Sequence, residues 1–219
     1  MKELYNVFLK HYGLLIFIFI IWTIHLLNQI FNLNLYELGI FPRNIDGLFG
    51  IIFSPLIHSA KDHHHIISNT LPFLILGWSL FYFYRPIAWR VLFFSWIATG
   101  VLVWLIARSS HHIGLSGVIY SLLFFIFFSG IIRSDTRLLT VAMLVVFVYG
   151  SMVWGLFPYD WTISHESHIS GAITGFCLSI FFKKQKASFK KTKTQWEIEE
   201  EQGIDDDSLD GIWNDEIKD

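Results

Sequence analysis

The sequence has one cysteine and little charge. Lysine, arginine, aspartate and glutamate make up 16% of its 219 residues, whereas about 25% is usual for a soluble domain. Residues 1–182 carry 9 Lys/Arg and 7 Asp/Glu, and residues 183–219 carry 7 and 11. The single cysteine, Cys177, excludes an internal disulfide, and its apolar surroundings indicate a packing role. So little charge in the first 182 residues excludes an ordinary soluble domain and indicates a membrane domain.

Apolar sequence fills these 182 residues, and 53% of the whole chain is hydrophobic. A helix that spans a bilayer needs about 20 apolar residues. The first apolar run is too long for a signal peptide and lacks a small-residue cleavage site. The broken stretch 32–57 is predicted to be a partly embedded loop resting on other helices. We therefore predict an all-α membrane protein with six transmembrane helices, at residues 12–31, 64–84, 88–107, 115–132, 138–157 and 166–182.

Lysine and arginine set the predicted orientation, because cytoplasmic loops carry an excess of both. Six spans place both termini on one side, and that side holds most of the basic residues. The other side carries only Arg43, Lys61 and Arg108. We therefore expect a multi-pass protein of the cell (inner) membrane with both termini in the cytoplasm. The starts of the second, fourth and sixth spans then lie together at the extracytoplasmic side.

Residues 183–219 are predicted to form a separate cytoplasmic tail, and residues 1–182 the membrane domain. The tail is basic at first, which suits the anionic headgroups of the cytoplasmic leaflet. Its second part is acidic and is predicted to be disordered. Membrane lipid is therefore an expected partner. The net charge of −2 arises in this tail and gives no reason to expect nucleic acid.

The stretch Gly114-Leu115-Ser116-Gly117 starts an apolar run. Serine needs an adjacent base to act as a nucleophile, and glycines on both sides would let a substrate backbone approach Ser116. The first N–H groups of a helix have no intrahelical acceptor, so those near Leu115 and Ser116 could bind an oxyanion. The alternative is a serine that caps the helix, with small neighbours that permit helix packing.

His168 begins the last span, and Gly171 and Gly175 follow it. Their spacing puts both glycines on one helix face, where another helix can approach closely. If that helix is the fourth span, His168 can reach Ser116 as its general base. Tyr120, one turn after Ser116, could stack on the imidazole. The alternative for His168 is a histidine that bonds a carbonyl at the membrane interface.

His65 and Asn69 lie four residues apart at the start of the second span, so they share a helix face. Both side chains can donate hydrogen bonds, which suits an oxyanion hole made partly of side chains. The alternative is a polar contact between helices. Which residue of the run His63-His64-His65 faces Ser116 stays open. His65 is preferred because of its spacing from Asn69, whereas His58, His63 and His64 are predicted to lie at the membrane interface, and His111 and His112 to face solvent.

With these residues in place, the chain resembles the rhomboid family of intramembrane serine proteases over residues 35–182. The resemblance rests on Gly114-Leu-Ser116-Gly117 with Tyr120, on His168-xx-Gly171-xxx-Gly175 and on His65-xxx-Asn69. It implies a six-helix core and a catalytic serine at the start of a shortened fourth helix, with its base on the sixth. It also implies an oxyanion hole shared by the backbone at Leu115 and Ser116 with His65 and Asn69.

The implied reaction is hydrolysis of peptide bonds in or near transmembrane segments of membrane proteins by a Ser116–His168 dyad. It requires no cofactor and no metal ion. Two alternatives remain. A non-catalytic protein of the same fold would bind transmembrane partners, but the intact Ser116, His168 and Asn69 disfavour it. A histidine-rich di-metal membrane enzyme is motivated by the ten histidines, since imidazole suits iron, but it leaves Ser116 and its glycines unexplained.

Overall fold

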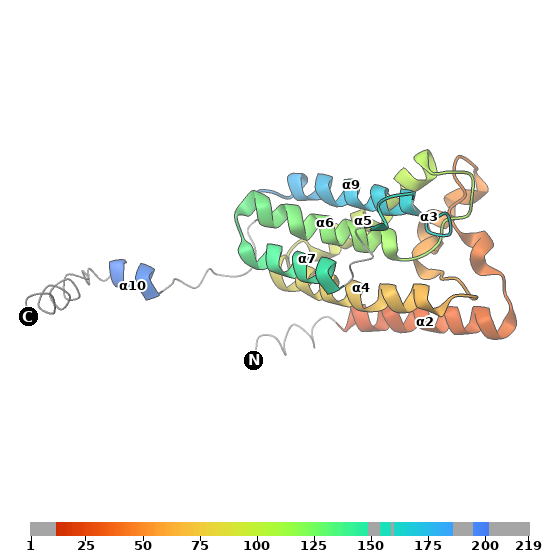
Figure 1. Ribbon diagram of the computed structural model, residues 1–219, viewed down its shortest axis with the longest axis horizontal. Helices are drawn as coiled ribbons and strands as arrows, with labels where there is room; N and C mark the ends of the chain where they lie inside the picture. Colours follow the sequence, from red (N-terminus) through yellow and green to blue (C-terminus); the bar gives the residue numbers. More distant parts are fainter. Residues whose placement is uncertain (1–11, 149–153, 159, 186–194, 202–219) are drawn as a thin grey trace, which may run out of the picture. The chain divides into compact units, whose positions relative to one another are not determined.

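The computed structural model describes residues 12–148, 154–158, 160–185 and 195–201 (Figure 1). Within this part of the chain the regular elements are helices, and the β-type pairing is an isolated bridge between Ile40 and His112. The chain divides into two compact units, residues 1–188 and 189–219. In the second unit Gln195–Glu201 form α10, and the remainder of that unit lies outside the described residues.

Four helices of the first unit are long and apolar enough to cross a membrane: α2 (Gly13–Phe31), α4 (His63–Phe83), α5 (Ala88–Ile106) and α6 (Ser116–Arg133). Each has at least 18 residues and is therefore about 27 Å long or longer, close to the roughly 30 Å of a bilayer core. Their bounds agree with the first four predicted spans to within one residue, because the apolar runs themselves set the bounds. Within the described residues the prediction of an all-α fold is confirmed, with four helices that could span a membrane.

The last two predicted spans coincide with shorter helices. α7 (Thr136–Val148) has 13 residues and α9 (His165–Phe181) has 17. Residues 149–153 of the fifth predicted span lie outside the described residues. Six membrane crossings therefore stay a prediction.

α6 is the central helix of the first unit and contacts α4, α5, α7 and α9 (Figure 1). In the apolar stretch of α6 61% of the residues are buried, compared with 22% in that of α2. Large apolar side chains are instead exposed on the outer faces of other helices, including Phe19, Phe147 and Phe181. Exposed apolar surface of this extent suits contact with lipid. α6 is thus largely surrounded by protein, and Ser116 at its start is partly exposed.

Residues 32–57 form short helical turns: η1 (Leu35–Leu38), η2 (Asp46–Leu48), α3 (Gly50–Phe53) and η3 (Ser54–Leu56). α3 rests on α5, where Trp96 donates its indole N–H to the carbonyl of Ile51 at 2.9 Å. The carbonyl of Ser54 accepts the N–H of Gly114, also at 2.9 Å. The segment therefore supports the residues that lead into α6.

Candidate active site

The chain turns sharply just before α6. Gly114 has a φ of +108°, a conformation that strains any residue with a Cβ, and the ring of His65 packs directly against it. α6 begins at Ser116, its N-cap residue is Leu115, and no side chain caps it. The alternative interpretation of Ser116 as a capping serine is therefore wrong.

The hydroxyl of Ser116 lies 2.8 Å from Nε2 of His168 on α9. On the other side of the ring, Nδ1 of His168 lies 2.7 Å from the carbonyl oxygen of Gly155. A carbonyl can only accept, so Nδ1 carries the ring proton of the neutral imidazole. Nε2 is then an acceptor, and the hydroxyl of Ser116 donates to it. This is the arrangement of a nucleophile and its general base.

Two neighbours fix the orientation of this imidazole. The Tyr120 ring stacks on it, with centroids 4.3 Å apart and planes 17° apart. Gly155 lies at its edge, where an added Cβ would overlap the Tyr120 hydroxyl and approach Nδ1 of His168. The sequence predicts the stacking of Tyr120. It does not predict the contact with Gly155, because this glycine precedes His168 by 13 residues and lies outside its helix.

Glycines bring α6 and α9 into backbone contact. A Cβ on Gly171 would overlap the carbonyl oxygen of Gly117, and a Cβ on Gly175 would overlap that of Ser121. A Cβ on Gly117 would lie 3.0 Å from the Thr99 methyl group and 3.2 Å from the Ser167 carbonyl oxygen, a tight fit without such overlap. The helix starts that carry Ser116 and His168 meet because this packing is so close.

Of the three consecutive histidines, His65 is the one whose ring lies at the turn before Ser116, against Gly114. His63 turns toward α2 and hydrogen-bonds there, and His64 is exposed. Asn69 is buried one turn after His65 and donates to the His65 carbonyl at 2.9 Å. An Asn amide has a second donor hydrogen, so this local bond does not use its full capacity.

His58, which the sequence does not assign to the site, is buried beside it at 2% exposure. Its Nε2 accepts the N–H of Leu115 at 3.4 Å, and its ring meets that of His65 at 5.0 Å. Burial, with the nearby His65 and His25, holds the pKa of His58 well below its usual value. His58 is therefore neutral and can accept this bond. One predicted oxyanion donor, the N–H of Leu115, is thus already hydrogen-bonded.

Arg108, in the link between α5 and α6, holds the loop that precedes α9. Its Nη2 donates to the carbonyls of Trp161 at 2.9 Å and Ile163 at 3.0 Å. Its Nη1 lies 3.6 Å from the carboxylate of Glu166, and the guanidinium lies over the Trp161 ring. We call these contacts the Arg108 clamp. The clamp ties together the two segments that carry Ser116 and His168.

The prediction that His112 faces solvent is wrong, since this residue is 2% exposed. Its backbone pairs with Ile40 through two 2.9 Å hydrogen bonds, which draw the link inward. Nε2 donates to the Arg108 carbonyl at 3.0 Å, so Nδ1 accepts from the Ser164 hydroxyl at 2.6 Å. Burial lowers the pKa of His112, although the bond to the Arg108 carbonyl opposes this. His112 thus joins the link to the N-cap of α9.

Fold and site together define a class, an all-helical membrane protein whose serine and histidine meet at the starts of two packed helices. The family model described as Rhomboid domain matches residues 46–185. Uncharacterized proteins of Mycobacterium bovis and Mycobacterium tuberculosis are 31% identical to this chain over 172 residues, which cover 74% of it and 70% of each relative. One of Mycobacterium leprae is 29% identical, covering 74% and 67%. The chain belongs to the rhomboid family.

Proposed function

We propose that this protein is an intramembrane serine endopeptidase that hydrolyses peptide bonds in or near transmembrane segments of membrane proteins. The observation that carries the proposal is the 2.8 Å contact between the Ser116 hydroxyl and Nε2 of His168. The carbonyl of Gly155 supports it, because it keeps the ring proton on the opposite nitrogen. Membership of the rhomboid family points in the same direction.

In the proposed reaction, Nε2 of His168 takes the proton of Ser116 while Oγ attacks the scissile carbonyl carbon. The imidazolium gives this proton to the nitrogen of the leaving amine, and an acyl-enzyme forms. His168 then takes a proton from water, whose oxygen attacks the acyl carbon, and returns the proton to Oγ. The Gly155 carbonyl and the Tyr120 ring hold the imidazole and favour its positive charge. No cofactor or metal ion takes part.

The oxyanion is proposed to bind the backbone N–H groups of Leu115 and Ser116 together with the side chains of His65 and Asn69. The N–H of Leu115 donates to His58 at 3.4 Å, which is a long hydrogen bond. An oxyanion can therefore replace His58 as its acceptor. Loss of one such donor typically lowers kcat by about 10² to 10³.

The proposed setting is the cell (inner) membrane, crossed six times with both termini in the cytoplasm. α7 and α9 belong to the fifth and sixth crossings of a membrane domain over residues 1–182, and residues 183–219 form the cytoplasmic tail. Ser116 and His168 would then face the extracytoplasmic side. Transmembrane proteins of this bilayer are the proposed substrates, and those whose helices unwind readily should present a carbonyl most easily.

A fluorophosphonate probe tests the nucleophile. Purified wild-type protein should be labelled covalently, mass spectrometry should map the label to Ser116, and Ser116→Ala should not be labelled. The matched control is Ser121→Ala on the same helix. The Ser121 hydroxyl donates to Ser95 at 2.8 Å and does not contact His168, so this variant should be labelled like wild type. A label on another residue, or one that survives Ser116→Ala, would sink the proposal.

The same probe tests the first alternative, and a metal analysis of the purified protein tests the second. A non-catalytic protein that binds transmembrane partners would be folded yet unreactive toward the probe. A metal enzyme would carry stoichiometric iron or zinc and lose its activity with the metal. Among the residues that the structure describes, no three His, Cys, Asp or Glu side chains converge as a ligand set, so no specific observation favours that second alternative.

A further inference from the structure

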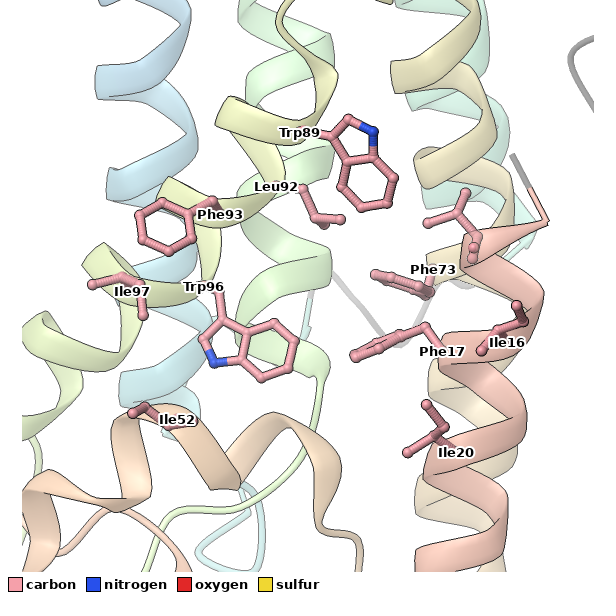
Figure 2. A pocket seen from close by; sticks show the side chains of 12 residues that line it. Ile16, Phe17, Ile20, Ile52, Phe73, Trp89, Leu92, Phe93, Trp96 and Ile97 are labelled. Atoms are coloured by element: carbon pink, nitrogen blue, oxygen red, sulfur yellow. The ribbon is translucent and has the colours of Figure 1, made fainter. Parts of the chain in front are cut away.

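An apolar groove with a volume of about 570 Å³ lies between α2 and α5. Figure 2 shows Phe17 and Ile20 of α2 facing Trp89 and Trp96 of α5 across the groove, with Ile52 of α3 at one end. None of these residues belongs to the proposed peptidase site. The groove is a feature that the proposed reaction does not use.

The groove exists because α2 and α5 are held by different neighbours. α2 packs on α4, where Leu14 lies against Gly77 and Trp22 donates its indole N–H to the Thr70 hydroxyl at 3.1 Å. α5 packs instead on α6, α9 and α3. The two helices therefore do not pack along their length, although Phe17 contacts Trp96, and apolar side chains line the space between them.

The walls of the groove offer apolar contact rather than hydrogen bonds. The indole N–H of Trp96 is already bonded to the carbonyl of Ile51. α2 and α5 are both long and apolar enough to cross a membrane, so the groove opens toward hydrocarbon. Water would find no set of polar partners there, and empty space would forfeit dispersion contacts. The walls therefore favour a hydrocarbon occupant.

Size indicates which hydrocarbon group fits. The stretch of α5 from Trp89 to Ile97 is about 12 Å long. The rings of Phe17 on α2 and Trp96 on α5 come within 5.5 Å of one another, centroid to centroid, across this stretch. A transmembrane helix is about 10 Å across and cannot lie between α2 and α5 at that point. A hydrocarbon chain is much slimmer and can lie beside the two rings.

We propose that this groove binds an acyl chain of a membrane phospholipid. Gly13 and Trp89 lie near the starts of α2 and α5, at the end away from Ser116. Trp89 is 60% exposed, and tryptophan is common at the level of lipid headgroups. The lipid therefore belongs to the leaflet on the side away from Ser116, and its chain runs from Trp89 toward Ile52.

A chain in this position would brace α3. Ile52 contacts the groove, and Ser54, two residues later, accepts the N–H of Gly114 at the turn before α6. The bound chain thus supports the segment on which the candidate site rests. The proposal does not depend on the chemistry of Ser116, and a protein without peptidase activity would bind the chain equally well.

Photo-crosslinking tests the proposal with the full chain in vesicles of phosphatidylethanolamine and phosphatidylglycerol. The probe is a phospholipid with a diazirine in its acyl chain, and mass spectrometry maps the modified residues. We expect crosslinks on Phe17, Trp96 and their neighbours at least fivefold more often than on exposed apolar faces elsewhere, such as that of Phe147. Ile20→Trp, which fills the groove, should lower the groove crosslinks at least fivefold.

Phe19→Trp is the matched control, because Phe19 is the preceding residue and is 72% exposed. It should leave the groove crosslinks unchanged. Added phospholipid should also raise the Tm of delipidated wild type and of this control by about 3 °C, but not that of Ile20→Trp. Ile97→Trp fills the groove from α5 if Ile20→Trp does not fold. The proposal would be overturned if wild type showed no more crosslinks in the groove than on its other apolar faces. It would also be overturned if a folded Ile20→Trp or Ile97→Trp protein showed as many groove crosslinks as wild type.

Discussion

Two helix pairs in the membrane unit are built in opposite ways. α6 and α9 approach until a Cβ on Gly171 would overlap a backbone carbonyl of α6, and the Ser116 hydroxyl between them is hydrogen-bonded. α2 and α5 stay apart and leave a groove of about 570 Å³ between apolar side chains. Close backbone approach occurs where, on our proposal, a proton moves between side chains 2.8 Å apart. The α2–α5 pair takes no part in the proposed reaction, so lipid can fill the space between these two helices.

The largest predicted difference between the two pairs is catalytic. His168→Ala should lower the cleavage of a transmembrane substrate about 10³-fold or more, since the general base is lost. Ile16→Val at the α2–α5 pair should change it less than about twofold, because Val keeps most of the apolar contact. Cleavage rates in vesicles measure both variants. If His168→Ala cleaved the substrate within about tenfold of the wild-type rate, His168 would not be the general base.

Stability should separate the tight pair from a looser one. An added methyl at Gly171 meets the backbone of Gly117, which cannot move aside alone. Gly171→Ala should therefore lower the free energy of unfolding by about 1–3 kcal/mol. Gly77→Ala between α4 and α2 meets the end of the flexible Leu14 side chain at 2.9 Å, so it should be tolerated better. Thermal unfolding compares them, and equal losses would mean that the α6–α9 contact is not special.

The Arg108 clamp should add a smaller effect at the same tight pair. Arg108→Ala removes two donors from the carbonyls of Trp161 and Ile163, and it should lower kcat about three- to tenfold by loosening the start of α9. Arg90→Ala is the control at the opposite end of α5, where Arg90 donates to the Pro86 carbonyl at 3.4 Å. It should leave kcat unchanged. If both variants behaved alike, the clamp would not position His168.

The smallest predicted effect is a pH dependence of stability. Burial lowers the pKa of His112 in the folded protein below the value of about 6.5 in the unfolded chain. The unfolded state therefore binds more protons below pH 6.5, and stability falls as the pH falls toward the folded pKa. His112→Gln should flatten part of this loss in Tm measured between pH 7.5 and 5. If the Tm of His112→Gln fell with pH as much as that of wild type, His112 would not be the cause of this pH dependence.

The sequence predicts the four long helices well for a physical reason. Each apolar run is as long as a membrane is thick, and a run ends where polar residues begin. The glycines at 171 and 175 likewise indicate a close contact, because their spacing on one helix face is local information. The face of α9 that meets α6 can thus be named from the amino-acid sequence alone.

The residues that the sequence does not place depend on contacts between distant segments. His112 is buried because its backbone pairs with Ile40, 72 positions earlier, and nothing near His112 indicates this pairing. Gly155 is the partner of His168 through a turn between α7 and α9. His58 adjoins the site because η3, which precedes it, packs against α6 and the Leu115 N–H donates to its ring. Short loops that pack on one another carry too little periodicity to be predicted.

Cleavage by the wild type and by Ser116→Ala tests the central claim most directly. Each protein is placed in vesicles with a single-pass substrate whose transmembrane helix contains helix-breaking residues, and the products are identified by mass spectrometry. The account predicts a cut in or near that helix by wild type and a rate at least about 10³-fold lower for Ser116→Ala. Cleavage by a folded Ser116→Ala protein at the wild-type rate would contradict it.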